Sequence, residues 1–534
     1  MIHTHNFQRF CCTSFIVSFD EIIFLHIPYF YMESQNRSTG ALFEVIPSFQ
    51  RRPEQVARWR TAGETWTFRL MRDPLNLEEI NRYGQALAIW RDNNTLTYVE
   101  PHGYKSDYPE EERQLLHLSF GKTGPRLSIA GDTEDEMAQT AAYFMQLENT
   151  ERKGTFYVSN HMDYFDFRAA RSHCFRHILQ LVPSLEVDLE GILLSVEQAV
   201  VLAARPHTII LSLSESSFED GGTAFIEALE KRTSSFGTLK IYMDPRLTDE
   251  NFKRLLQIEM IERLELPSLP DELAIFPFLS KVGSLSCWVY SGTLLSEEFQ
   301  NLKIAPKKLT VVIDDDEQHF PADAAISCLR RIAGCGHLVE LNIAFDCFHA
   351  NEDEHEGGSI PGIVTQELVR AIRANANLRT LELFHSMNKV KWEPHIGSLL
   401  DCFEEHEGLR EVKVVVDNEE EAFGDDFWRL QKLLSVNRRI TVTNQEGKLI
   451  SDGNHIDQLY AFNGFCRGSK ELGVGAHPER SSVIMNALVD RAANDLQCTA
   501  LLLSDHTDVL FEIVQPVENH GFESFVTSRS NGVS

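Results

Sequence analysis

Two short stretches of the sequence carry residue types that could do chemistry. Gly121-Lys122-Thr123 matches the end of a phosphate-binding loop, but Leu116 stands where G-x-x-x-x-G-K-[ST] requires its first glycine, so the backbone could not turn around a phosphate. Residues 504–508, Ser-Asp-His-Thr-Asp, offer the groups of a hydrolase, yet the chain has no G-x-S-x-G nucleophile turn. We therefore predict no catalytic residue and no enzyme activity.

Two acidic stretches contain types of residue that bind metal ions. One is the loop 349–358, with two histidines and four carboxylates, and the other is Asp314–His319, which lacks the glycine and the final glutamate of a calcium loop. Dense acid in a loop is usually just solvated, and neither stretch has a second ligand set. Gly473-Val474-Gly475 lacks the third glycine of a dinucleotide-binding turn. We predict no metal and no cofactor.

The charge of the chain limits its partners. Among 534 residues, 79 are acidic and 50 are basic, which gives a formal net charge of −29. Such a field repels a phosphate backbone, and no run of lysine and arginine compensates for it. Nucleic acid and an anionic membrane surface are therefore disfavoured. A protein partner with basic character, or a charge that serves only colloidal solubility, fits better, and the sequence does not say which partner.

The cysteines and the N-terminus bear on where the chain works. Ten cysteines are scattered without a C-x-x-C pair, which predicts reduced, buried thiols and a cytoplasmic location. Residues 1–32 form a doubtful extension, and Met32 is a candidate for the true start. Residues 14–31 are apolar enough to raise the question of an anchor, but Asp20 and Glu21 interrupt them at a point where charge in a bilayer is costly. We expect no membrane association unless that segment provides it.

Three segments share the spacing L-x-x-L-x-L. They are Leu338–Ile343, Leu378–Leu383 and Leu409–Val414, and each follows an amphipathic helical pattern and a polar turn. In a strand, alternate residues face one side, so the fourth and sixth positions enter a core together. A helix then returns the chain to begin the next parallel strand.

The same spacing can be followed through most of the chain. The central apolar residues of the candidate strands lie 21 to 32 residues apart, with one gap of 40 that contains the acidic loop 349–358. They are Leu127, Phe156, Leu185, Leu211, Leu239, Leu264, Leu285, Leu309, Leu341, Leu381, Val412 and Ile440. We predict an α/β solenoid with a parallel sheet on its concave side and helices outside. A doubly wound α/β domain is the alternative, since its strands also alternate with helices.

These residues resemble the leucine-rich-repeat family, in particular its longer, ribonuclease-inhibitor-like members. Asn377-x-Arg379-Thr380-Leu381-Glu382-Leu383 is the nearest local match, and the resemblance spans about Leu127 to Val442. It implies a solenoid that binds proteins. The asparagine or cysteine that follows the last strand leucine in the family, and satisfies backbone groups in the turn, is mostly absent, so the repeats are degenerate.

The flanking regions differ from the repeats. Residues 33–118 are predicted to form a small N-terminal domain or cap, with a hairpin from Ala86–Trp90 and Thr95–Val99. The solenoid is predicted over 119–450, a helical C-terminal cap over 451–518 and a flexible tail over 519–534. Terminal caps are expected because an open repeat array would otherwise expose its ends.

The predicted functional residues are strand positions that point outward on the concave face. They are Lys240, Tyr242, Arg263, Glu265, Trp288, Glu340, Asn342, Thr380, Glu382, Phe384, Glu411 and Lys413. Aromatic side chains among charges are typical of interface hot spots, although each could instead pack against a neighbouring loop. We therefore expect a protein–protein interaction scaffold. The alternatives are a substrate-recognition subunit of a ubiquitin ligase and an enzyme carried by the N-terminal domain.

Overall fold

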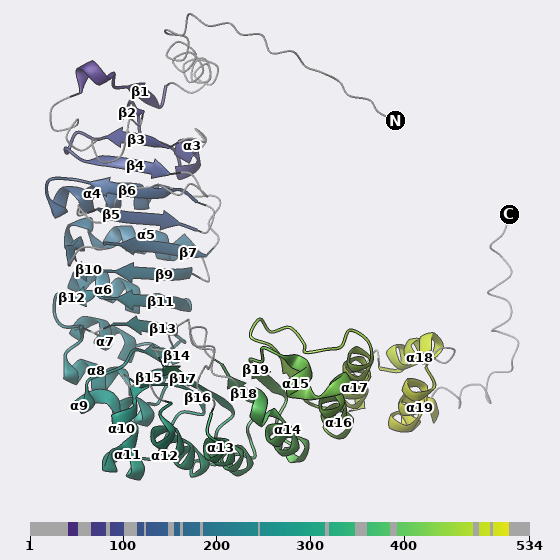
Figure 1. Cartoon of the computed structure of the whole chain (residues 1–534). Coiled ribbons are helices and arrows are strands. Elements are labelled where there is room, and N and C mark those ends of the chain that lie inside the picture. The colour runs from purple at the N-terminus through teal and green to yellow at the C-terminus, as the bar shows by residue number, and fades with distance from the viewer. Residues whose placement is uncertain are drawn as a thin grey trace, which may run out of the picture. The chain divides into compact units, whose positions relative to one another are not determined.

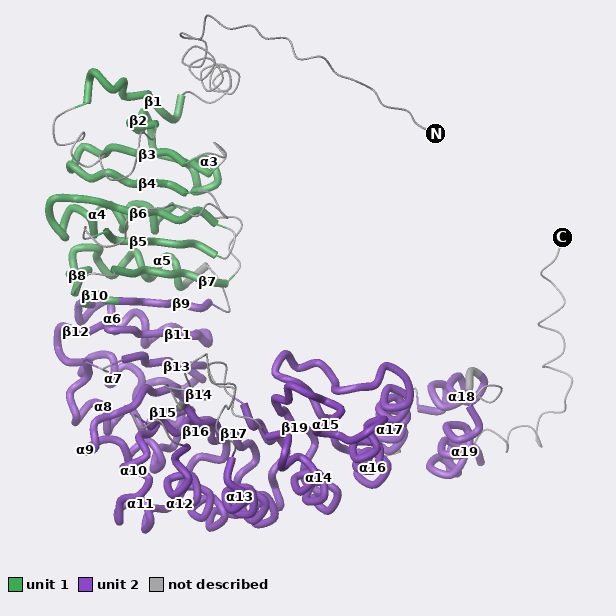
Figure 2. The backbone as a smooth tube through the Cα atoms, in the orientation of Figure 1, with its two compact units in different colours: residues 1–182, 191–193 green, residues 183–190, 194–534 purple. Residues whose placement is uncertain are grey.

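The structure, a computed structural model, has a mixed α/β fold in which helices flank a large, mostly parallel sheet (Figure 1). The chain divides into two compact units, residues 1–182 with 191–193 and residues 183–190 with 194–534 (Figure 2). The residues described are 41–51, 66–81, 86–100, 115–121, 124–147, 154–160, 164–181, 185–243, 246–315, 320–347, 360–384, 392–473, 480–491 and 495–511.

The first unit is built largely from antiparallel strands. Its strands are β1 (Phe43–Val45), β2 (Thr67–Leu70), β3 (Leu87–Trp90), β4 (Leu96–Glu100), β5 (Leu116–Phe120), β6 (Arg126–Ala130), β7 (Thr155–Ser159) and β8 (Phe165–Asp166). Its helices are η1 (Ser48–Gln50), α3 (Leu77–Asn81), α4 (Glu134–Gln146), η2 (Phe167–Ala170) and α5 (Ser172–Leu181). The predicted hairpin is confirmed, because β3 and β4 pair antiparallel with Trp90 opposite Leu96. Asn94, with φ 62°, makes the left-handed turn between them.

Two of the predicted parallel strands belong to this unit, and for them the prediction is wrong. Leu127 lies in β6 and Phe156 in β7, and both strands pair antiparallel with β5, where Leu118 faces Leu127 and Phe120 faces Phe156. Regular spacing of apolar residues does not specify the direction in which strands pair. Antiparallel neighbours therefore produced the same signal as a repeat.

The second unit contains a ladder of parallel strands in chain order. The strands are β9 (Leu185–Glu190), β11 (Ile209–Ser214), β13 (Gly237–Tyr242), β14 (Ile261–Leu266), β15 (Ser284–Tyr290), β16 (Lys308–Asp315), β17 (Glu340–Cys347), β18 (Thr380–Leu383), β19 (Glu411–Val414) and β20 (Thr441–Thr443). Each pairs in parallel with the next. Sequential order is the arrangement expected of a repeat array and differs from the doubly wound alternative.

The register of the ladder agrees with most of the predicted centres. The eight residues from Leu211 to Val412 lie side by side, one per strand. At the two ends the predicted centres, Leu185 and Ile440, are two residues early: Val187 and Val442 occupy the common row. Residues of this row are at most 2% exposed and form the centre of the core.

Helices follow the strands and lie along one side of the ladder (Figure 1). The longer ones are α6 (Val196–Ala203), α7 (Thr223–Glu230), α8 (Asp249–Leu255), α12 (Ala322–Ala333), α13 (Gly362–Ala374), α14 (Ile396–Glu405) and α16 (Trp428–Val436). Short segments between them are α9 (Asp271–Ala274), η3 (Phe276–Leu279), α10 (Ser291–Leu295), α11 (Glu297–Asn301), η4 (Glu393–His395), α15 (Glu419–Phe423) and η5 (Asp425–Phe427), with the short strands β10 (Ile192–Leu194) and β12 (Ser217–Phe218). Apolar helix positions such as Val364, Leu368 and Ile372 are buried, which is the pattern of a one-sided cover.

Buried polar side chains join successive repeats at the ends of their helices. Asn375 follows α13, and its amide donates to the carbonyl of Ile332 in the preceding repeat, 3.1 Å away. His406, after α14, lies 3.1 Å from the carbonyl of Asn375, and Asn437, after α16, donates to the carbonyl of His406 at 3.2 Å. These side chains satisfy carbonyls that a helix end leaves open. They stand before the strand, whereas the family's asparagine stands after it.

The described residues after β20 include three helices, α17 (His455–Gly473), α18 (Arg480–Arg491) and α19 (Leu496–Asp505), in the region predicted as a helical cap. Tyr460 of α17 covers the free edge of β20. Its hydroxyl accepts from the backbone N–H of Val442 and donates to the carbonyl of Val442, both at 3.2 Å. Burial raises the pKa of Tyr460 to about 12, so the hydroxyl keeps its proton. A covered edge cannot template another strand.

Candidate functional site

Alternate residues of β9 to β20 face away from the helices and form the surface that we call the open face. Strands such as β13 and β15 alternate buried and partly exposed residues along their length. One polar row crosses all ten strands in register. It consists of Asp188, Ser212, Lys240, Glu265, Ser286, Thr310, Asn342, Glu382, Lys413 and Thr443.

All twelve residues predicted to point outward lie on this face, and none is buried. Tyr242, Arg263 and Glu411 are exposed, and the other nine are partly exposed. The expected aromatic cluster is interrupted, however. Trp288 pairs with Val312 and Val312 with Ala344, and both of these smaller residues are buried. The aromatic side chains therefore do not form one continuous patch.

Many charges on the open face are already paired with one another. Lys308 contacts Glu340 on the next strand at 2.6 Å, and Lys413 contacts Glu382 at 3.5 Å. Asn342 also donates to Glu382, at 3.1 Å. Pairs of this kind on a surface are individually weak, each contributing about 0–1 kcal/mol. They fix the side chains in place without neutralising the whole face.

The start of the ladder holds a carboxyl that has no such partner. Asp188 of β9 makes no hydrogen bond or ion pair with the described residues, while its neighbour Glu186 contacts Lys240 at 3.7 Å. Burial, followed by the charges of Glu190 and Glu186, raises the pKa of Asp188 to about 6. The sequence prediction missed this residue because it named outward positions only from Lys240 onward, and none in the strands before it. The alternating Glu-x-Asp-x-Glu within an apolar strand was the available signal.

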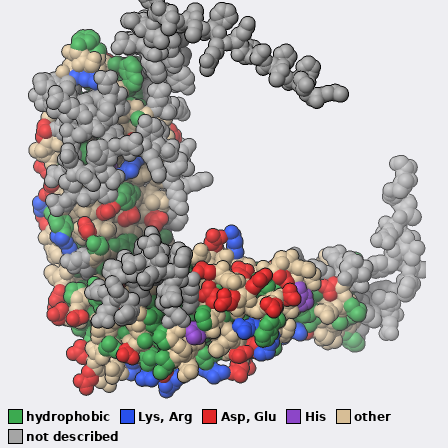
Figure 3. All heavy atoms as spheres, in the orientation of Figure 1, with side chains coloured by type: hydrophobic (Ala, Val, Ile, Leu, Met, Phe, Trp, Pro, Cys, Tyr) green, Lys and Arg blue, Asp and Glu red, His purple; other side chains and the backbone are tan. Residues whose placement is uncertain are grey.

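Tyr242 lies on the same face, two strands from Asp188. The residue is 44% exposed. Burial of the remainder, then the charges of Glu265, Asp188 and Glu186, raise the pKa of its hydroxyl. The ring is therefore close enough to these carboxylates to sense them. In the space-filling view, acidic side chains gather near β9 and around α15, whose first turn holds Glu419, Glu420 and Glu421 (Figure 3).

The hydrolase-like residues near the C-terminus form a structural network. His506 is fully buried, with Nε2 3.2 Å from the hydroxyl of Ser469 and Nδ1 3.0 Å from Arg480. Arginine can only donate, so Nδ1 accepts and Nε2 carries the hydrogen. The imidazole therefore cannot take a proton from Ser469, whose hydroxyl donates to Asp505 at 2.9 Å. This network joins α17, α18 and α19.

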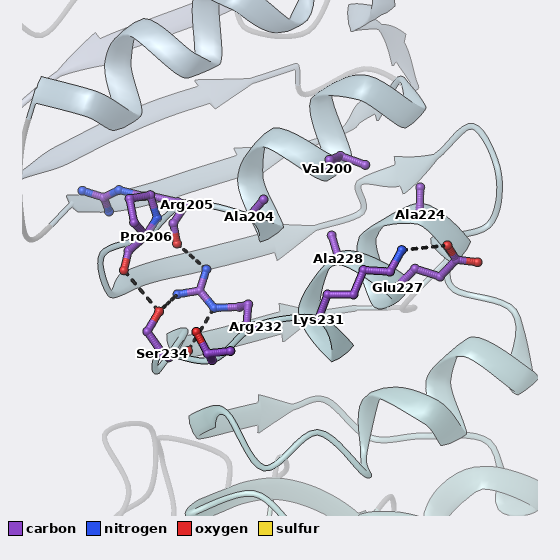
Figure 4. A pocket seen from close by; sticks show the side chains of 11 residues that line it. Val200, Ala204, Arg205, Pro206, Ala224, Glu227, Ala228, Lys231, Arg232 and Ser234 are labelled. Atoms are coloured by element: carbon purple, nitrogen blue, oxygen red, sulfur yellow. Dashed lines mark hydrogen bonds and ion pairs between the residues drawn. The ribbon is translucent and has the colours of Figure 1, made fainter.

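A pocket of about 480 Å³ lies on the helix side, between the ends of α6 and α7 (Figure 4). Arg232 donates to the carbonyls of Ala203 at 2.7 Å and Ser235 at 2.6 Å, and to that of Arg205. At the other end Lys231 contacts Glu227 at 3.6 Å. The guanidinium thus joins the carbonyl end of α6 to the loop between α7 and β13, which is a structural role.

A second pocket, of about 580 Å³, lies in the first unit beside α4 and η2. His173 lines it, and its Nε2 lies 3.6 Å from the sulfur of Cys174. The thiol, however, donates to the carbonyl of Ala170 at 2.9 Å, and burial raises its pKa. A thiol held in its protonated form is a poor nucleophile.

Several sequence predictions fall outside the described residues. They are Lys122-Thr123 of the glycine-lysine motif, the acidic loop 349–358, residues 316–319, Val474-Gly475, the extension 1–32 and the tail 519–534. Among the residues that are described, no group of histidine, cysteine and carboxylate side chains is arranged to hold a metal ion. Seven cysteines whose side chains are described carry free thiols, and all of them but Cys335 are buried.

No protein-family model matches the chain, and a comparison with curated proteins finds no significant match. In the described part of the chain, no helix combines the length and the apolar character needed to span a bilayer.

Proposed function

We propose that the second unit is a leucine-rich-repeat-like solenoid whose open face is concave and binds a protein partner. The supporting observation is the polar row that runs in register from Asp188 to Thr443. A sheet whose sole purpose was stability would cover both faces with apolar residues. An ordered row of charged and hydroxyl side chains instead offers many fixed contacts to a second molecule.

The charge of the chain selects the kind of partner. With a net charge of −29, the approach of a basic protein is favoured and that of nucleic acid is opposed. The buried free thiols fit a cytoplasmic location, which is part of the proposal. In the described residues, no feature favours either the ubiquitin-ligase alternative or an N-terminal enzyme.

Charge reversal on the open face tests the proposal. The tagged full-length chain is used to capture partners from native extract, and the bound proteins are quantified by mass spectrometry. The double variant Glu382→Lys with Glu411→Lys should lose most specific partners. A control with the same change in charge, Glu227→Lys with Glu405→Lys, lies on the helices α7 and α14 and should keep them. If both variants lost their partners to the same extent, or if neither variant lost them, the open face would be rejected as the binding surface.

A further inference from the structure

One place on the open face combines a carboxyl without a partner and an exposed aromatic ring. Asp188 of β9 and Lys240 of β13 lie in one row, with Ser212 of β11 between them. Tyr242 stands two residues beyond Lys240 and so faces the same way. Strand β11 contributes only the small side chains of Ser212, which is buried, and Ser214 between them.

The other charges nearby are already engaged. Glu186 pairs with Lys240 at 3.7 Å, Glu265 pairs with Arg263 at 2.8 Å, and Glu190 also has an interaction partner. Asp188 is half-buried and makes no hydrogen bond or ion pair with the described residues, and the charge of Lys240 acts on it only at a distance. A carboxylate removed from water in this way gains more from a cation than one that is fully exposed. The arrangement is thus complementary to one positive group delivered from outside.

We propose that Asp188 and Tyr242 together receive an arginine side chain of the partner protein. This inference rests on the function proposed above and names the chemistry of its partner. A guanidinium is planar and carries a fixed fork of donors, so it can pair with a carboxylate while its face stacks on a ring. A lysine ammonium lacks that shape. The occupant is therefore an arginine-bearing segment rather than any basic surface.

Binding of a labelled peptide to the full-length chain tests this. The probe is a fluorescent (Arg-Ser)₄ peptide, and the comparison peptides replace arginine with lysine or with neutral citrulline. Fluorescence anisotropy at physiological salt should give the order arginine, then lysine, then citrulline. Asp188→Asn should weaken arginine-peptide binding about 10-fold to 100-fold, the range for a charged hydrogen bond. Tyr242→Ala should weaken it about 2-fold to 5-fold.

Two controls separate this site from general attraction to an acidic chain. Tyr242→Phe keeps the ring and should bind as wild type does. Asp401→Asn makes the same charge change on helix α14, where Asp401 contacts Lys432, and should also bind as wild type does. Equal weakening by Asp188→Asn and Asp401→Asn, or equal binding of the arginine and citrulline peptides, would overturn the inference. The extract capture then tells the two proposals apart. If the Glu382→Lys, Glu411→Lys variant loses its partners from extract while the arginine peptide shows no preference for Asp188, the proposed function stands and only the arginine site is rejected.

Discussion

Strands β3 and β4 of the first unit are buried on both faces, whereas strands such as β13 and β15 of the second unit alternate buried and exposed or partly exposed residues. In β4, Tyr98 and Val99 point in opposite directions, yet they are only 4% and 2% exposed. In β13, Leu239 is fully buried while the next residue, Lys240, is partly exposed. A partner can reach only the second kind of sheet. The proposed binding function therefore concerns the second unit, whose strands offer partly exposed side chains on one face.

The largest effect is expected from charged substitutions in the two kinds of strand. Tyr98→Asp and Val99→Asp should each destabilise the first unit by about 4 kcal/mol or more, because both place a carboxylate in an apolar interior. In the second unit Leu239→Asp should do the same, and Lys240→Asp should change stability by less than about 1 kcal/mol. Thermal melting followed by circular dichroism measures this. A severe effect of Lys240→Asp would show that the open face is covered.

Substitutions on the buried and the outward side of the strands are expected to differ in their effect on stability. Leu381→Ala should destabilise by about 2–5 kcal/mol, since it empties a site that is fully buried. The double reversal of Glu382 and Glu411 should leave the melting temperature nearly unchanged while it weakens partner binding. Urea denaturation and extract capture, applied to both proteins, check the contrast. If both variants lost stability equally, the assignment of inside and outside would be wrong.

The sequence predicted the ladder well and the first unit poorly, for one physical reason. The repeat spacing placed eight centres, Leu211 to Val412, in one row, because each L-x-x-L-x-L has a helix and a turn that fix its frame. Leu185 begins β9 and Ile440 directly precedes β20, so both are two residues early, since apolar residues alternate without marking a centre. Leu127 and Phe156 lie in antiparallel strands, because spacing carries no pairing direction.

The candidate site was predictable in part. Residues of the central strands, such as Glu382 and Lys413, point outward as the motif predicts. Asp188 was missed because no outward position was predicted in the strands before Lys240. The interruption of the aromatic row by Val312 and Ala344 depends on which strands become neighbours, which local sequence does not specify. The residue after each helix that joins the repeats, such as Asn375, occurs three positions before a strand leucine and could have been noticed.

The hydroxyl of Tyr460 covers the backbone at the edge of β20, and a single substitution can remove it. Tyr460→Phe should destabilise by about 1–3 kcal/mol, because the backbone N–H of Val442 then loses its acceptor. Urea denaturation measures the loss, and size-exclusion chromatography shows whether the opened edge promotes association. Tyr290→Phe is the matched control, at a tyrosine that is 40% exposed. Identical midpoints for the two variants would show that the hydroxyl does not seal the strand.

The smallest effect concerns pH and stability. The pKa of Asp188 is raised from 3.8 to about 6, so the folded chain holds its proton more tightly than the unfolded chain. The free energy of unfolding therefore falls as pH rises from about 3.8 to about 6, and it stays lower at higher pH. Asp188→Asn should melt a little higher than wild type at pH 7.5 and equally at pH 3.5. Glu190, Glu186 and Lys240 are the charges that set this shift. A higher melting temperature for wild type at pH 7.5 would contradict it.

Thiol labelling at adjacent positions of one strand tests the central claim most directly. Cys287 is 1% exposed and faces the helices, while Ser286 faces the open side. In Ser286→Cys, a maleimide reagent should label position 286 quickly and position 287 hardly at all, with peptide-level mass spectrometry to separate them. Native extract should slow labelling at 286 but not at a cysteine placed at Glu227 on helix α7. Rapid labelling of Cys287, or protection at 227 instead of 286, would contradict an open face that binds a partner.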